Sequence, residues 1–205
     1  MYTYRKNSST KEYLPLLLNN KYDHLFISGV APEIQANRRY ATIGFLDGSV
    51  FEGCNEVQVF WVGEKPYGGY GTKAWGEIYH GPHIHKYPEL MIHLGTDPDN
   101  PWDLGAEIEM HVGPEMEKHI ITRSTIFYFP ANLVHGPFRI LKVTRPILKI
   151  TINQSPKHTE KALRNLVSEE DLKGMIFIDA GYEDEGIEPK IQLPDIAGPD
   201  AKYQR

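Results

Sequence analysis

The sequence has a single cysteine, Cys54, among its 205 residues, and this scarcity limits the kinds of site that the chain can build. One cysteine cannot form an intramolecular disulfide, and it cannot supply the paired thiolates of a structural zinc module. No base adjacent in sequence marks Cys54 as a nucleophile, so we interpret it as a small buried hydrophobe. A metal site of nitrogen and oxygen ligands would fit this composition.

Basic runs and long apolar runs are also missing. The chain carries 27 acidic against 22 basic residues, a formal net charge of −5, and no run of five or more lysines and arginines. Nucleic acid and anionic membrane surfaces are therefore poor partners. The apolar patch LPLLL near the N-terminus is too short for a signal peptide, and no apolar stretch of about 18 residues occurs. These absences predict a soluble cytoplasmic protein.

Helical periodicity is scarce, and short runs of aromatic and β-branched residues take its place. Such runs begin near His24 and continue through RYATIGFL, EVQVFWVG, AEIEMHVG and ILKITI, with Gly, Pro, Asn and Asp between them. This pattern is typical of short strands separated by turns. Many short strands of this kind predict an all-β sandwich or barrel.

Two short helices are predicted outside the strands. Ser9–Glu12 has the S-x-x-E form of a capping box before apolar residues at helical spacing. Thr159–Val167 places its apolar residues on one side of a short helix. We therefore divide the chain into an N-terminal helical segment (1–22), a β-barrel (23–155) and a C-terminal part (156–205). That last part consists of a helix and an acidic arm rich in proline and glycine, which we expect to pack loosely.

Histidine is concentrated in one part of the chain. Seven of the nine histidines lie in the 56 residues from His80 to His135. His83 and His85 are two residues apart, which places both imidazoles on one face of a strand, close enough to share a metal. Glu89 opens the next predicted strand, where its carboxylate can face the same point, and His135 follows a predicted turn. These four residues form a candidate metal site.

The candidate ligands resemble the paired motifs of the cupin superfamily. The first motif is H-x-H-x-x-x-E, and the second, about forty residues later, is P-x-N-x-x-H. The resemblance implies an antiparallel jelly-roll barrel, also called a double-stranded β-helix, that holds one divalent metal. It also implies that His83, His85, Glu89 and His135 are the metal ligands. It covers roughly Glu77 to Leu141, about a third of the chain.

Three residues depart from the usual cupin motifs. Gly95 is one position closer to the motif glutamate than usual, Asn132 stands where glycine is usual, and Arg139 stands where asparagine is usual. Asparagine tolerates a left-handed backbone almost as glycine does, so Asn132 is a mild departure. Arg139 changes the chemistry, because a guanidinium beside an open metal site can clamp a substrate carboxylate. Alternatively, Arg139 pairs with an acidic residue at the barrel mouth.

The ligand set favours chemistry over a structural role. Three neutral imidazoles and one carboxylate suit divalent Fe, Mn, Ni, Co or Zn, and the sequence does not choose among them. Six-coordinate geometry would leave two positions for water or substrate. The cupin resemblance allows dioxygenase, isomerase, lyase or decarboxylase activity. We therefore expect an enzyme that acts on a small oxygenated molecule such as a carboxylic acid. The alternative is a non-catalytic module that binds or senses a small ligand.

Other residues near the motifs have weaker interpretations. His93 shares a strand face with Glu89 and is the candidate catalytic residue, a proton shuttle, although an inward histidine satisfied by a neighbour is as common. Arg139, Tyr87 and Arg123 are the candidate substrate-binding residues. For Tyr87, packing on the rim is the stronger interpretation, and Arg123 is a weaker version of the Arg139 hypothesis.

Two histidines are expected to lie outside the site. His80 has the wrong strand parity to join His83 and His85, and His158 is isolated in the sequence. By analogy with cupins we also expect a homodimer, and the segment before residue 40 is available to cover a sheet edge.

Overall fold

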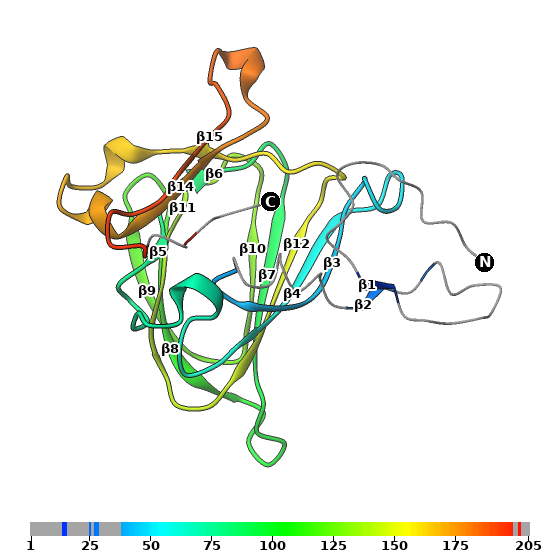
Figure 1. The fold of residues 1–205 in the computed structure, drawn as a ribbon, viewed down its shortest axis with the longest axis vertical. Helices are drawn as coiled ribbons and strands as arrows, with labels where there is room; N and C mark the ends of the chain where they lie inside the picture. The colour runs from blue at the N-terminus through cyan, green and yellow to red at the C-terminus, as the bar shows by residue number, and fades with distance from the viewer. Residues whose placement is uncertain (1–13, 16–24, 26, 29–37, 199–200, 202–205) are drawn as a thin grey trace.

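The computed structural model describes residues 14–15, 25, 27–28, 38–198 and 201 (Figure 1). Within these ranges the chain forms β-strands, short 3-10 turns and loops, and no α-helix occurs in them. The predicted all-β character is therefore confirmed for the described part of the chain. Two strands near the N-terminus, β1 (Leu14–Pro15) and β2 (Ile27–Ser28), form a separate antiparallel pair.

One layer of the fold is a five-stranded antiparallel sheet in the order β10-β7-β12-β4-β3. Its strands are β3 (Ala41–Leu46), β4 (Glu56–Val62), β7 (Glu89–Gly95), β10 (Thr125–Phe129) and β12 (Ile147–Asn153). Alternate residues of the inner strands are buried, as expected for a sheet with one face toward a core. The buried set is Glu89, Met91 and His93 in β7, and Ile147, Lys149, Thr151 and Asn153 in β12.

The second layer contains β11 and its neighbours. Its strands are β5 (Tyr79–His80), β6 (His83–Ile84), β8 (Asp103–Val112), β9 (Glu117–Arg123), β11 (His135–Val143), β13 (Lys161–Ala162), β14 (Met175–Asp179) and β15 (Lys190–Gln192). β11 pairs antiparallel with β5, β6 and β8, whereas β14 runs parallel to β5. The 3-10 turns that follow β4 in the described part of the chain are η2 (Gly68–Tyr70), η3 (Arg164–Leu166), η4 (Asp171–Gly174) and η5 (Glu183–Glu185).

The main core lies between the two layers. Met91 and Ile147 from the five-stranded sheet pack in one cluster with Ile108, Met110 and Ile140 from the second layer. Face-to-face packing of two antiparallel sheets is the arrangement of a jelly roll. The described strands are hydrogen-bonded in separate sheets rather than in one closed ring, so the predicted jelly-roll barrel takes the form of two packed sheets. Cys54, expected in the core, is only half-buried in the turn before β4.

Both predicted helices are wrong where the structure describes them. Leu14 and Pro15 belong to β1, and the rest of that predicted helix lies outside the described residues. The segment Thr159–Val167 forms β13 and η3 instead of an α-helix. β13 pairs with β6, and the Glu160 N–H donates to the Ala180 carbonyl at 2.9 Å. A helix of this length is marginal in isolation, so pairing at a sheet edge outcompetes it.

β14 is a strand that the sequence did not reveal. All five of its residues are buried, and it pairs with β5 on one side and β15 on the other. A short apolar run without alternation does not reveal whether it is a strand or a helix segment. The C-terminal part therefore adds a buried strand beside His80, and its acidic stretch beyond Tyr182 contains η5 and the exposed strand β15.

Several large apolar side chains are exposed on the five-stranded sheet, including Trp61, Leu94, Ile126 and Tyr128. Isolated surface apolar residues are ordinary, and the predicted homodimer stays a prediction. In the described part of the chain, no helix has the length and apolar character needed to span a membrane. The cytoplasmic location also stays a prediction.

Candidate metal centre

The four predicted metal ligands lie together at one end of the space between the sheets. His83 begins β6, His85 follows that strand, Glu89 begins β7 and His135 begins β11. Because β6 pairs with β11, His83 and His135 are direct neighbours across the ladder. All four side chains are buried, and their ligand atoms lie within 4.8 Å of one another.

The turn before β11 holds His135 against the first motif. Asn132 has φ of 63°, the left-handed conformation expected at the position where cupin motifs usually have glycine. Its N–H donates to the His85 carbonyl at 2.8 Å. The turn is thereby fixed to the segment that carries two of the other ligands.

Each of the three imidazoles is oriented by a backbone carbonyl. Nδ1 of His83 lies 2.8 Å from the Gly81 carbonyl, and Nδ1 of His135 lies 3.0 Å from the Leu133 carbonyl. Nδ1 of His85 is hydrogen-bonded to the Thr159 carbonyl. A carbonyl can only accept, so the proton of each neutral ring is on Nδ1. Each Nε2 is left with a lone pair for a metal, which is the orientation that metal-binding histidines usually have.

The Glu89 carboxylate faces two of these Nε2 atoms. Its Oε2 lies 3.0 Å from His135 Nε2 and 3.4 Å from His85 Nε2. Burial acts to raise the pKa of Glu89, but the interactions with His135 and His85 outweigh it and hold this pKa well below its usual value. Burial lowers the pKa of His83 well below its usual value. Glu89 is therefore ionised and His83 neutral, the forms in which both bind metals.

The contacts among the ligand atoms do not give every one of them a well-formed hydrogen bond. Glu89 Oε2 and His135 Nε2 are buried without a hydrogen bond of good geometry among the described residues. Buried polar atoms without partners are rare and need a physical reason. Three imidazole nitrogens and one carboxylate oxygen, directed at one point, could hold one divalent ion, and they leave its identity open.

A cavity of about 80 Å³ opens beside the cluster. Besides the four candidate ligands, the described residues that line it include Lys149, Thr151 and Asn153 of β12, Phe138 of β11, and His80, His158 and Glu160. A concave site lined by a few convergent polar groups is the usual form of a small-molecule site.

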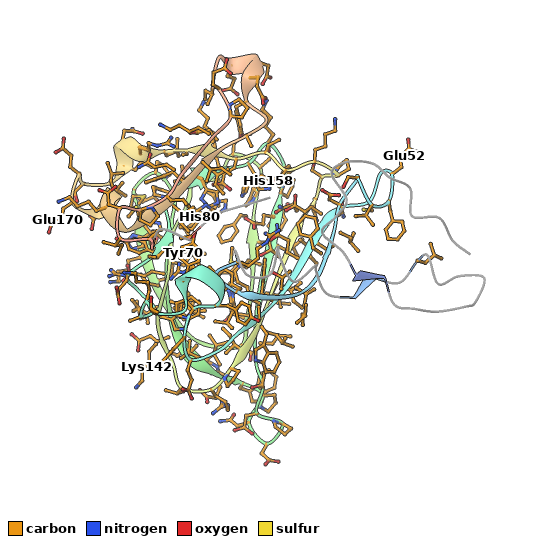
Figure 2. All side chains as sticks on the ribbon, in the orientation of Figure 1. Glu52, Tyr70, His80, Lys142, His158 and Glu170 are labelled. Atoms are coloured by element: carbon orange, nitrogen blue, oxygen red, sulfur yellow. The ribbon has the colours of Figure 1, made fainter. Side chains whose placement is uncertain are left out.

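His80, His158 and Glu160 are site residues that sequence reasoning missed. Figure 2 shows His80 and His158 close together, and both contact the Glu160 carboxylate, with His80 Nε2 at 2.8 Å and His158 Nε2 at 3.2 Å. Strand parity excluded His80 wrongly, because β5 and β6 are separate strands with Gly81 and Pro82 between them. Glu160 had no signal of its own, since its segment was interpreted as a helix.

Tyr87 lies behind one of the ligands. Its ring stacks on the His85 imidazole with centroids 5.1 Å apart, and its hydroxyl lies 3.0 Å from His158 Nδ1. The His158 imidazole is therefore held between Tyr87 on one side and Glu160 on the other. These contacts connect Tyr87 to the candidate site through two histidines rather than through the cavity surface.

The structure does not bring Arg139 to the cluster. Its Nε donates to the Gly76 carbonyl at 2.9 Å, and its guanidinium lies 4.7 Å from the centre of the Tyr79 ring. It lines a different hollow, beside Tyr79 and Trp75. The register of β11 shifts between His135 and Phe138, and such an irregularity reverses the alternation of side chains.

The other two predicted residues also lie away from the cavity. His93 is fully buried, with its ring stacked on Phe138 and edge-on to Phe127. Neither of its ring nitrogens has a hydrogen-bond partner among the described residues. Arg123 is exposed at the end of β9. A catalytic role for His93 and a substrate role for Arg123 stay predictions without support from these positions.

Comparison with known proteins gives a likeness of fold. No protein-family model matches the sequence, and no curated protein matches it significantly. A double-stranded β-helix protein from Klebsiella pneumoniae subsp. pneumoniae is 10% identical, with a TM-score of 0.39 over 62% of this chain and 85% of its own. Oxalate oxidase in complex with glycolate is 13% identical, with a TM-score of 0.43 over 71% of this chain and 66% of its own.

A third solved structure, the polyketide cyclase RemF from Streptomyces resistomycificus, is 8% identical, with a TM-score of 0.40 over 64% of this chain and 74% of its own. The structural neighbours are thus cupin or double-stranded β-helix proteins, the class that the sequence motifs resemble. This likeness concerns the fold and assigns no activity to the chain.

Proposed function

We propose that this protein is a metal-dependent enzyme of cupin type. In this proposal one divalent ion is held by His83, His85, Glu89 and His135, and the substrate is a small oxygenated organic molecule. A divalent ion in such a site lowers the pKa of bound water and polarises substrate oxygens. The reaction is dioxygenation, isomerisation, decarboxylation or a lyase-type elimination, and the ion is Fe, Mn, Ni, Co or Zn.

One observation carries the metal part of this proposal. All three imidazoles are bonded through Nδ1 to backbone carbonyls, so their Nε2 lone pairs are available at the same point as an ionised carboxylate. Glu89 Oε2 lies 3.0 Å from His135 Nε2, but neither atom has a hydrogen bond of good geometry among the described residues.

The catalytic part is supported by proton-carrying groups beside the cluster. Glu160 is 1% exposed and contacts the Nε2 atoms of both His80 and His158. The His158 imidazole lies between two polar groups, with Glu160 3.2 Å from its Nε2 and the Tyr87 hydroxyl 3.0 Å from its Nδ1. His158 lines the cavity and is therefore placed to hold or move a proton at bound substrate.

Metal analysis tests the first part of the proposal. Protein purified from its native source should contain close to one divalent ion per chain, and the double variant His83→Ala/His135→Ala should contain none. The matched control is His111→Ala/His119→Ala, because these two histidines are on β8 and β9 and neither lines the cavity. Stoichiometric metal in the His83/His135 variant would refute the assignment.

Turnover distinguishes the enzyme from a non-catalytic binding module. Metal-replete protein is assayed with a panel of hydroxy acids, keto acids and catechols, with oxygen uptake and product formation measured separately. Oxygen uptake supports the dioxygenase branch, and product formation without oxygen supports the isomerase, lyase or decarboxylase branch. Saturable binding of a panel compound without conversion would favour a binding or sensing module instead.

A further inference from the structure

The outer face of the five-stranded sheet is apolar from edge to edge. In β7 and β12, the residues that alternate with the buried ones are partly buried or exposed, so they point away from the core. Each of these outward residues is a leucine or an isoleucine. We call the surface formed by the outward residues of all five strands the outer sheet face. Its most exposed side chains are Ile43, Trp61, Leu94, Ile126 and Tyr128.

Strand pairing joins these side chains into one continuous surface. Consecutive partners across β10, β7, β12 and β4 form a row of Ile126, Ile92, Ile150 and Val59. Neighbouring rows run on both sides of this one, and Tyr128 and Trp61 belong to them. Directly opposite side chains on one face of a sheet lie close enough to touch. The exposed residues are therefore members of one patch rather than scattered surface residues.

The usual distribution of polar residues is reversed in the two inner strands β7 and β12. Their buried, inward residues include the polar set Glu89, His93, Lys149, Thr151 and Asn153. Among the described residues of the five strands, no outward side chain is charged. An antiparallel sheet with one face in water normally places its polar residues on that face. The pattern of this sheet is instead that of a sheet covered on both sides.

The size of the outer sheet face follows from ordinary sheet geometry. Five strands about 4.8 Å apart, with residues that rise about 3.3 Å each, give a face of about 20 Å by 20 Å. Two such faces bury about 800 Å² as flat area, and more as accessible surface because side chains project from them. Stable interfaces begin at about 1,200 Å², so the face suits a partner that dissociates at low protein concentration.

The shape and the chemistry of the face indicate which partner it fits. A surface without charge has no electrostatic pattern with which to select a different charged partner. Two identical twisted sheets, in contrast, pack face to face at about 30°, with their apolar side chains interdigitated. Such a contact is isologous, because the same patch serves both subunits. Trp61 and Tyr128, on β4 and β10, are of the residue types that contribute most to interfaces.

We propose that the outer sheet face binds the same face of a second copy of this chain. The homodimer expected by analogy with cupins concerned a sheet edge, whereas this interface is a sheet face and rests on the residue pattern of this chain. The contact backs β7 and β12, which carry Glu89 and Lys149 toward the cavity on their other side. It needs no metal at the His/Glu cluster, so it stands independently of the proposed function.

Sedimentation velocity of the full chain tests whether a dimer forms. Between about 1 and 200 µM, the wild-type protein should pass from the mass of one chain to the mass of two, as a micromolar dissociation constant requires. A single-chain mass over the whole range would overturn the proposal.

Charged variants test whether the dimer uses the outer sheet face. Leu94→Lys/Trp61→Lys should weaken the dimer about a hundredfold or more, because association would then bury unpaired charges. Ile126→Lys, at the most exposed position of the face, should weaken it about tenfold. The matched control is Ile120→Lys/Trp102→Lys, since both residues are exposed and lie outside the five-stranded sheet. Folded face variants that dimerise as wild type does would overturn the proposal.

Labelling of wild-type protein decides the question without any variant. A photoactivated carbene reagent should label Trp61, Leu94 and Ile126 several-fold less at high protein concentration than at low, while Ile120 and Trp102 are labelled equally at both. Equal, strong labelling of the face at all concentrations would show that no copy covers it. Weak labelling in a protein that stays monomeric would show that the chain covers its own face. Either result would overturn the proposal.

Discussion

Arg139 follows His135 by four residues on β11, yet the two side chains lie in different hollows of the molecule. A regular strand would place both on one face. The register shift between His135 and Phe138 changes this, so Phe138 lines the cavity in place of Arg139. Gly136, inside the shifted segment, has φ of 89°, a backbone conformation that disfavours residues with a Cβ.

Gly136→Ala should destabilise the protein by about 1–3 kcal/mol in denaturant unfolding. The substitution strains the left-handed backbone, and its Cβ would lie 2.7 Å from the Gly81 carbonyl oxygen in the strand region that carries His83. Gly53→Ala is the matched control, since Gly53 has φ of 77° and a Cβ added there would meet nothing within 4 Å. Equal losses for both variants would show that the close approach to Gly81 does not matter.

The candidate ligands could be proposed from sequence by two routes. His83, His85 and Glu89 lie within seven residues, whereas His135 joins them through the pairing of β6 with β11 and was assigned through the resemblance to the second cupin motif. The position of Arg139 could not be predicted, because one irregular pairing reverses parity without a unique sequence signal.

The residues that contact one another beside the candidate ligands could not be predicted from sequence, for a different reason. Glu160 and His158 meet His80 only after β13 and β14 have added to the second layer. Such contacts join positions about eighty residues apart in the chain. Local periodicity carries no information about contacts between residues so far apart in the sequence. In this chain it predicted that Thr159–Val167 forms a helix.

Gly81→Ala should destabilise the protein by about 1–3 kcal/mol, the usual cost of overpacking a filled site. Its Cβ would lie 2.2 Å from Phe177 Cε1 on β14. Gly81→Ala should cost less unfolding free energy in a Phe177→Leu background than in the wild-type protein. A double-mutant cycle of unfolding free energies measures this difference. If the two substitutions change the unfolding free energy additively, then Phe177 of β14 does not limit the space at Gly81.

His93→Leu should reduce the loss of stability on acidification. Burial, together with the Lys149 charge, holds the pKa of His93 well below its usual value, although Glu89 opposes this shift. Below about pH 6.5 the unfolded chain takes up a proton that folded His93 does not, so stability falls as pH drops. Between pH 7.5 and 5.5 the variant should lose about 1 kcal/mol less unfolding free energy than wild type.

The control for this experiment is His119→Leu, because His119 is exposed on β9. That variant should keep the wild-type pH dependence. At pH 7.5, His93→Leu should be at least as stable as wild type, because it removes two buried nitrogens that lack partners among the described residues. Loss of turnover in a stable, metal-replete His93→Leu protein would instead support the predicted catalytic role of this residue.

Removal of the metal should lower the melting temperature, and divalent ions should restore it. A ligand that binds the folded chain alone adds about 2.7 kcal/mol at a free concentration one hundred times its dissociation constant. Glu89→Gln should weaken this response, since it keeps the shape of the side chain and removes the charge that faces His85 and His135. Scanning calorimetry of chelator-treated protein, with and without each candidate ion, measures the effect.

Glu117→Gln is the matched control, because Glu117 is exposed on β9 and faces His119 rather than the candidate ligands. An equal metal-induced shift in Glu89→Gln and wild type would exclude Glu89 from the metal site.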